Sequence, residues 1–164
     1  MSTTAYAIVD SPIGEILLTA EEGALTRLYM APFQLDSAWE HDPAALAEPA
    51  RQLGEYFAGE RTEFELELRP QGTAFQQRVW ALLLEIPYGE TTTYGALADE
   101  LGNPRTGRAV GLANGRNPIS IVVPCHRVIG ADGSLTGYGG GLERKRHLLD
   151  LEAEVAAGFR ATLW

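Results

Sequence analysis

The chain has very little cysteine: Cys125 is the only one among 164 residues. A single cysteine excludes an internal disulfide. Together with only three scattered histidines, it also excludes the ligand spacing of a metal site, so we expect no metal. The first four residues, Met1-Ser2-Thr3-Thr4, lack the basic start and the apolar run of a signal peptide. We therefore expect a reducing, cytoplasmic location.

Long apolar runs are also missing. No stretch approaches the roughly 18 apolar residues that a membrane helix needs. The composition, 45% hydrophobic and 21% charged, is typical of a folded globular protein. The length suits one large domain or two small ones. A Pro-Gln-Gly stretch at 70–72 favours two domains, which we place at residues 1–72 and 73–164.

Net positive charge is the third feature that the chain lacks, since its formal net charge is −9. Residues 1–70 hold 4 basic and 13 acidic side chains, whereas residues 71–164 hold 9 of each. One stretch, 101–131, has no acid and four arginines: Arg105, Arg108, Arg116 and Arg127. These arginines can form an ordinary solvated face or a small anion-binding patch. Any contact with a polyanion is expected in the second half only.

The first half predicts strands and one helix. Alternating apolar residues and turn residues predict strands at 6–9, 15–19 and 25–29, and a half-buried strand at 64–69. Asp42-Pro43 is typical of a helix start. Pro49 then predicts a break or a restart, and Gly59 suits the end of the helix.

The second half predicts three helices before the cysteine. The first is expected from Thr73, which forms a capping box with Gln76, to near Pro87. The second is expected from Thr92 or Thr93 to Leu101, and the third from Arg105 or Thr106 to Gly115. The last two, joined by a glycine-containing turn, favour a helix-turn-helix. A closing helix is expected from about Leu142.

The third of these helices repeats glycine every four residues, at 107, 111 and 115. Glycine costs about 1 kcal/mol relative to alanine inside a helix, so three on one face need a reason. One explanation is tight packing against a neighbouring helix. The other is a smooth face that approaches a groove or a ligand, and the flanking Arg108 and Arg116 favour it slightly.

Apolar, β-branched residues at 119–123 predict a buried strand that runs into Pro124-Cys125-His126-Arg127. A free cysteine is often an inert core residue. Here His126 and Arg127 supply positive potential that favours a thiolate, and the amide of Asn117 is placed to hold the turn.

His126 can take the proton of Cys125 directly only if the backbone turns sharply; otherwise a water has to carry it. A carboxylate that orients His126 would complete the relay. Spacing leaves four candidates open: Asp132, Glu143, Asp150 and Glu152. The glycine-rich run at 137–141 lacks the lysine of a P-loop and is either a cover over a site or a tight loop.

The segment Pro124-Cys125-His126-Arg127-Val128-Ile129-Gly130 resembles the signature of the O6-alkylguanine-DNA alkyltransferases. The resemblance extends over residues 72–152. It includes Phe-Gln-x-x-Val-Trp at 75–80, Ile-Pro-x-Gly at 86–89, Tyr94-Gly95, Arg108-Ala109-Val110-Gly111, Asn117-Pro118 and Tyr-x-Gly-Gly-Leu at 138–142.

This resemblance implies an α+β protein. A ribonuclease-H-like α/β domain would come first, on position and strand pattern alone, followed by a mainly helical winged-helix or helix-turn-helix domain. The implied activity is one irreversible transfer of an alkyl group to the protein from O6 of guanine, and from O4 of thymine, in double-stranded DNA after nucleotide flipping. A monomer without cofactor is implied.

The resemblance also implies roles for single residues. Cys125 would accept the alkyl group, and His126 would act on it through a water. Glu152 would orient that histidine, and Asn117 would brace the turn. The Tyr94 hydroxyl would bond guanine N3. The minor groove would meet Arg108, which fills the gap left by the flipped nucleotide, together with Tyr94, Gly107, Ala109, Gly111 and Asn114. The guanine pocket would comprise Val128, Leu135, Tyr138 and Gly139.

Two other functions fit a lone cysteine next to a histidine: a non-catalytic DNA-binding module and a thiol hydrolase. Relatives that bind DNA without transfer have tryptophan in place of the cysteine, so Cys125 argues against a non-catalytic lesion-binding module. A thiol hydrolase using Cys125 and His126 is the third hypothesis. Some family members have serine where Gly139 stands here, which bears on how bulky substrates are held.

Overall fold

The computed structural model describes residues 3–135 and 137–162, and the side chains of 159–162 are outside the description. The chain forms two compact units. One comprises Met1–Gln71 and Pro118–Val122, and the other Gly72–Asn117 and Val123–Trp164. The chain thus passes from the first unit to the second near residue 72, where a boundary is expected. The short segment Pro118–Val122 then returns to the first unit.

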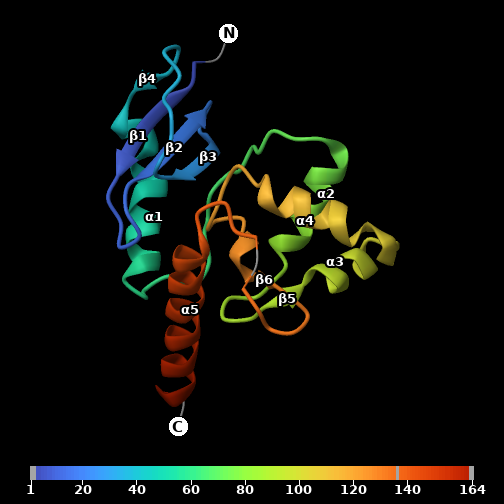
Figure 1. Cartoon of the computed structure of the whole chain (residues 1–164). Helices are drawn as coiled ribbons and strands as arrows, with labels where there is room; N and C mark the ends of the chain where they lie inside the picture. Colours follow the sequence, from blue (N-terminus) through green and yellow to red (C-terminus); the bar gives the residue numbers. More distant parts are fainter. Residues whose placement is uncertain (1–2, 136, 163–164) are drawn as a thin grey trace. The chain divides into compact units, whose positions relative to one another are not determined.

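The first unit contains a four-stranded sheet with the order β3-β2-β1-β4 (Figure 1). Its strands are β1 (Ala5–Val9), β2 (Ile16–Glu21), β3 (Ala24–Met30) and β4 (Glu40–His41). The first three pair antiparallel, and β4 pairs parallel with β1. The turn between β2 and β3 is Glu22-Gly23, with φ of 50° and 81°, as a two-residue hairpin requires. The three strands predicted at 6–9, 15–19 and 25–29 are confirmed.

One helix packs on this sheet. A 3₁₀ turn, η1 (Pro43–Leu46), leads into α1 (Ala47–Phe57), so the predicted restart is confirmed. Pro49 lies in the first helical turn, where its missing N–H breaks no helical hydrogen bond. Leu46, Leu53 and Tyr56 are fully buried or nearly so. Apolar side chains thus hold the helix and sheet together.

Two predicted strands are wrong. Residues 64–69 make one bridge, Leu25 with Leu68, and Glu65 bonds through its backbone N–H and C=O to the side chain of Gln52. Residues 119–123 make one bridge, Leu28 with Ile119, and then turn at Ile121, whose φ is +71°. The apolar side chains of 64–69 are half-buried and those of 119–123 are buried, as the pattern indicated, but burial alone does not provide a ladder of hydrogen bonds.

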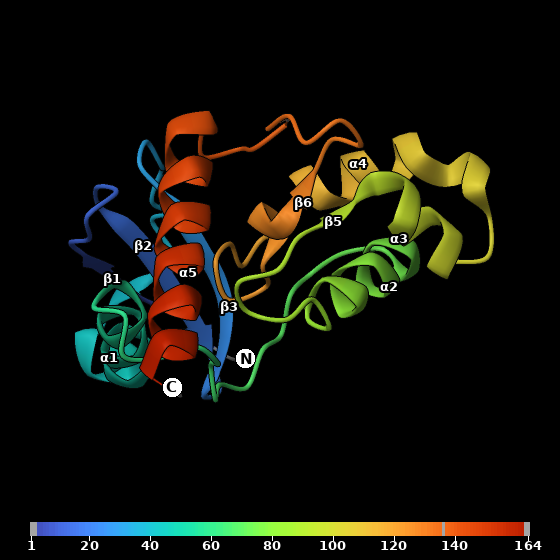
Figure 2. The same ribbon diagram turned by 90° about the horizontal axis from the view of Figure 1, so that it is seen from below.

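The second unit begins with three helices. They are α2 (Ala74–Leu83), α3 (Tyr94–Glu100) and α4 (Gly107–Gly115), the last preceded by a 3₁₀ turn, η2 (Pro104–Thr106). The capping box of Thr73 and Gln76 is formed, and Thr93 caps α3 by accepting from the Ala96 N–H. The indole N–H of Trp80 donates to the Ala113 carbonyl at 2.9 Å and ties α2 to α4. The helix-turn-helix prediction is confirmed by this group of helices (Figures 1 and 2).

The rest of the second unit carries the cysteine. A 3₁₀ turn, η3 (Cys125–Arg127), leads into β6 (Val128–Ile129), which pairs parallel with β5 (Thr92–Thr93). The long helix α5 (Leu142–Thr162) follows and contacts η3. Within the described part of the chain, no helix is both long and apolar enough to cross a membrane.

Candidate active site

Cys125 begins the tight turn η3. Its backbone N–H donates to the Val123 carbonyl at 2.8 Å, and the Arg127 N–H donates to the Pro124 carbonyl at 3.0 Å. The side-chain amide of Asn117 donates to the same Val123 carbonyl at 2.7 Å. The cysteine is 4% exposed and Asn117 is 8% exposed. The backbone therefore does turn sharply at the cysteine, and Asn117 lies where it can brace that turn.

His126 is buried beside one carboxylate. Its Nε2 lies 2.7 Å from Oε2 of Glu152, so Glu152 is the one of the four candidate carboxylates that bonds the histidine. Burial, opposed by the Glu152 carboxylate, lowers the pKa of His126 below its usual value, so the ring is neutral at neutral pH. Nε2 then carries the hydrogen, and Nδ1 is the basic nitrogen. Among the described residues, nothing forms a hydrogen bond with that buried Nδ1.

Arg127 is not the source of positive potential that the sequence suggested. Its guanidinium donates to both oxygens of Glu152, at 2.7 and 3.0 Å, and to the Ile86 carbonyl at 2.8 Å. Burial acts to raise the pKa of Glu152, but the bonds and charges of His126 and Arg127 outweigh it and lower the pKa to about 2. The two charges offset each other, so Arg127 belongs to this buried pair and not to the arginine patch.

The sequence reasoning missed Lys145. This residue of α5 is fully buried, and its Nζ donates to the Val128 carbonyl at 2.6 Å. Burial lowers the pKa of Lys145, and the charge of Cys125 acts in the opposite direction. One signal could have found it, because Lys145 is the only lysine in a chain whose other basic residues are all arginine.

The glycines of α4 lie along an open face. A Cβ built on Gly107 or Gly115 meets nothing within 4 Å, and one on Gly111 would come only to 3.9 Å of the Tyr94 ring. Helix packing within the described residues therefore does not explain the glycine repeat. The exposed residues of this face and its approach are Arg105, Arg108, Ala109, Leu112, Gly115 and Arg116. The glycines leave much of this face without side chains, and arginines lie at both of its ends.

Asn114 corrects one expectation. It is 2% exposed, on the side of α4 that also buries Val110 and Ala113. Its side-chain Nδ2 lies 3.4 Å from the Cys125 carbonyl. Asn114 therefore faces the cysteine turn and cannot lie in a DNA groove as the helix is built.

Two glycines of the loop after β6, Gly137 and the expected pocket residue Gly139, lie near Tyr94 and the end of α4. A Cβ on Gly137 would lie 3.6 Å from the Tyr94 hydroxyl, and one on Gly139 would lie 3.9 Å from the Gly115 carbonyl. Val128 is buried, and Leu135 and Tyr138 are half-buried. The contact at Gly139 is an ordinary one, so space there does not exclude a serine.

Two family models match nearly the whole chain. The ribonuclease-like domain of 6-O-methylguanine DNA methyltransferase matches residues 4–70, and the DNA-binding domain of the same protein matches residues 74–154. The chain belongs to the 6-O-methylguanine DNA methyltransferase family. The predicted α+β class, with a ribonuclease-like first domain and a helical DNA-binding second domain, is confirmed.

Members of this family from bacteria and archaea are similar over most of their length. The methylated-DNA–protein-cysteine methyltransferase of Mycobacterium tuberculosis is 57% identical over 92% of this chain and 93% of its own. The protein of that name from Methanosarcina acetivorans is 52% identical over 90% of this chain and 97% of its own. Among solved structures, Mycobacterium tuberculosis OGT in complex with DNA is 56% identical and has a TM-score of 0.88 over 92% of this chain and 94% of its own.

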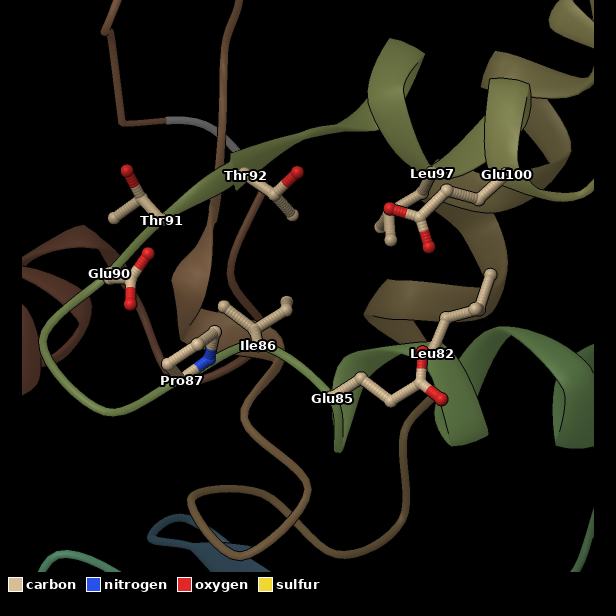
Figure 3. Close-up of a pocket in the computed structure, with 9 residues that line it drawn as sticks. All are labelled: Leu82, Glu85, Ile86, Pro87, Glu90, Thr91, Thr92, Leu97 and Glu100. Atoms are coloured by element: carbon tan, nitrogen blue, oxygen red, sulfur yellow. The ribbon is translucent and has the colours of Figure 1, made fainter.

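The second unit of the chain also has an acidic pocket (Figure 3). The pocket has a volume of about 290 Å³ and lies between the end of α2, the loop after it and α3. Its lining includes Glu85, Glu90 and Glu100. Three carboxylates repel phosphate, so this pocket is not the DNA site. Within the described part of the chain, no group of histidine, cysteine and carboxylate side chains is arranged to hold a metal ion.

Proposed function

We propose that the chain repairs DNA directly, by one irreversible transfer of an alkyl group from O6 of guanine, or O4 of thymine, to Sγ of Cys125. The family assignment supports methyl transfer to a protein cysteine. The observation that carries the residue assignment is the position of Cys125. It is the only cysteine of the sequence, and it stands next to a buried histidine that is hydrogen-bonded to Glu152.

Cys125 is activated by proton transfer to Nδ1 of His126. Glu152 accepts from Nε2 and thereby fixes the tautomer in which Nδ1 is basic. Following the family resemblance, a water carries the proton from Sγ to Nδ1; the sharp turn at Cys125 also permits direct transfer. The carboxylate stabilises the imidazolium that forms, in the way that a triad carboxylate does.

The thiolate then attacks the alkyl carbon in line with the O6–carbon bond. A sulfur–carbon bond forms, the carbon–oxygen bond breaks, and its electron pair stays on the guanine. The guanine anion takes up the proton that Cys125 gave to His126. A donor near guanine N3, the hydroxyl of Tyr94, lowers the barrier by stabilising that anion. The thioether is not cleaved, so each protein molecule reacts once.

DNA binds along the open face of α4. The smooth helix surface at Gly107, Ala109 and Gly111 enters the minor groove, and Arg108 fills the space left by the flipped nucleotide. Flipping costs a few kcal/mol, and the target atom is inaccessible without it. The flipped base occupies the pocket formed by the Val128 backbone, Leu135, Tyr138 and Gly139. The protein acts as a monomer in the cytoplasm, where its thiol stays reduced.

A quantitative repair experiment tests this proposal. Duplex DNA with one O6-methylguanine is mixed with increasing protein, and restored guanine is measured by chromatography of the digested DNA. We expect restored guanine to equal the protein added, and Cys125→Ser to restore none. DNA binding without restoration would instead support the non-catalytic module. Repeated turnover of an ester substrate would support the thiol hydrolase.

The role of Arg108 is tested with two substrates. We expect Arg108→Ala to slow repair of duplex DNA at least about tenfold, because insertion into the stack is lost. Reaction with free O6-benzylguanine should change little, since no stack is opened. Arg146→Ala, which removes an exposed charge from α5, is the matched control. Equal losses on duplex and free base would contradict the insertion role.

A further inference from the structure

Asn114 holds an unused hydrogen-bond acceptor inside the second unit. It lies near the end of α4, and only 2% of its surface is exposed. Its Nδ2 lies 3.4 Å from the Cys125 carbonyl, whereas its Oδ1 has no hydrogen-bond partner among the described residues. Buried polar atoms nearly always have a partner, and an acceptor without one costs free energy. The reaction steps proposed above leave this atom without a task.

The orientation of the Asn114 amide follows from its neighbour. A carbonyl oxygen can only accept a hydrogen bond, so the atom that faces the Cys125 carbonyl has to be the amide nitrogen. The oxygen is therefore the group that is left unused. An atom of this kind can bind only a donor, which restricts the chemistry of any ligand that reaches it.

Asn114 lies where the cysteine turn and the glycine-rich loop both reach α4. The cysteine turn adjoins it through the Cys125 carbonyl. The residue after it, Gly115, has its carbonyl 3.9 Å from the position of a Cβ on Gly139, a residue of the proposed guanine pocket. A base whose alkyl carbon reaches Cys125 therefore comes to the segment of the molecule that contains Asn114.

The two proposed substrates differ in what they can offer to an acceptor. Alkylation at O6 removes the hydrogen from N1 of guanine, so the exocyclic 2-amine is the only N–H donor left on the base. Alkylation at O4 of thymine removes the hydrogen from N3 in the same way, and that base then carries no N–H donor. A buried acceptor beside the reacting cysteine thus distinguishes the two lesions.

We propose that Oδ1 of Asn114 accepts a hydrogen bond from the 2-amine of the flipped guanine, and that Asn114 thereby favours O6-alkylguanine over O4-alkylthymine. This inference deepens the proposed function and rests on it. Asn114 makes and breaks no covalent bond in the reaction. It acts on specificity, because a site that bonds a donor of its substrate rejects a substrate without that donor, whose entry leaves the buried acceptor unpaired.

Deleting the amine from the substrate and the acceptor from the protein tests the pair. Rate constants of single-turnover repair are measured for duplexes that carry O6-methylguanine or O6-methylhypoxanthine, which differ only in the 2-amine. The proteins are wild type and Asn114→Leu, whose side chain has a similar branched shape and no polar atom. Comparing the ratio of the two rate constants between proteins cancels the effect of the amine on base pairing.

We expect the preference for O6-methylguanine over O6-methylhypoxanthine to be at least about fivefold greater in wild type than in Asn114→Leu, because one buried hydrogen bond is lost. Gln34→Leu replaces another amide by leucine at an exposed position of the first unit and should keep the wild-type ratio. The same ratio in wild type and Asn114→Leu would overturn the proposal, since the amine would then have another acceptor.

A second pair of substrates tests the preference between lesions. Asn114→Leu should slow repair of O6-methylguanine at least about fivefold and change the rate constant for O4-methylthymine little, because that base has no donor to lose. With excess DNA, a variant that folds only in part gives a smaller amplitude of alkylation, and the rate constant still reports the folded fraction. Equal slowing of both lesions would contradict the proposal.

Failure of this inference is distinguishable from failure of the proposed function. A wild-type protein that restores no guanine refutes the proposed function. A wild-type protein that restores guanine, with the same preference between substrates as Asn114→Leu, refutes only the role of Asn114.

Discussion

At the scale of single residues, Glu152 is the centre of the site. It is 1% exposed, and it bonds both His126 and Arg127. Removing such a carboxylate leaves a buried guanidinium without its partner. This typically lowers the free energy of unfolding by about 3–5 kcal/mol, a large part of a small domain's stability. The same group that sets the histidine tautomer therefore also stabilises the fold.

This gives a pH-dependent prediction for stability. The folded-state pKa of Glu152 is lowered to about 2, below its value in an unfolded chain. Its contribution is thus present above about pH 5 and is lost as the pH falls toward 2. We expect the difference in unfolding free energy between wild type and Glu152→Gln to shrink by about 2 kcal/mol from pH 6 to pH 2.5, measured by urea unfolding.

The matched control for that experiment is Glu154→Gln, an exposed position on the same helix. It should follow the wild-type curve at every pH. If wild type and Glu152→Gln lose the same stability in acid, the buried pair of Glu152 and Arg127 is not the cause of that loss.

At the scale of elements, the starts of helices were predictable because their signals are local, whereas α2 ends at Leu83, before the predicted Pro87. Thr73 and Gln76 satisfy each other's backbone N–H groups in the capping box, which needs no information about the rest of the chain. The strands at 64–69 and 119–123 were wrongly predicted for the opposite reason. Their pattern reports which side chains are buried, whereas a strand also needs a neighbour with a free edge.

The site was partly predictable for the same reason. Cys125, His126 and Asn117 are close in sequence, and local chemistry indicated them. Glu152 was one of four candidates from spacing, since the partner of a buried histidine depends on where a distant helix packs. Lys145 was missed because a single lysine carries no spacing pattern, although it is the only lysine of the chain, and its burial is seen only in the folded protein.

The capping box gives an element-scale prediction. Thr73→Ala removes the side-chain bond to the Gln76 N–H and should lower the free energy of unfolding by about 1 kcal/mol. Thr62→Ala, at an exposed loop position, serves as the control. Chemical denaturation of the three proteins decides it. Equal stability of Thr73→Ala and wild type would mean that α2 is held by tertiary packing alone.

At the scale of the whole molecule, charge is divided unequally between the two units. The first unit carries the entire net charge of −9, and the second is neutral in formal charge. The structure reduces the basic patch from four arginines to three, because Arg127 is neutralised by Glu152. Only Arg105, Arg108 and Arg116 remain exposed in that stretch.

Three exposed arginines predict weak salt dependence. Each phosphate contact contributes about −0.9 to the slope of log K against log salt, so we expect a slope near −3 for duplex DNA. Arg116→Ala should reduce its magnitude by about one. Fluorescence anisotropy at several salt concentrations measures this. A slope as steep as about −6 would mean that basic groups outside α4 and its approach meet the backbone.

The role of Cys125 as a single-use alkyl acceptor can be tested by the intact mass of the protein after reaction with excess duplex DNA carrying O6-methylguanine. We expect a gain of one methyl group per protein that does not increase with further DNA, located on Cys125 by peptide mapping. An unchanged mass while the lesion disappears, or a methyl group on another residue, would contradict it.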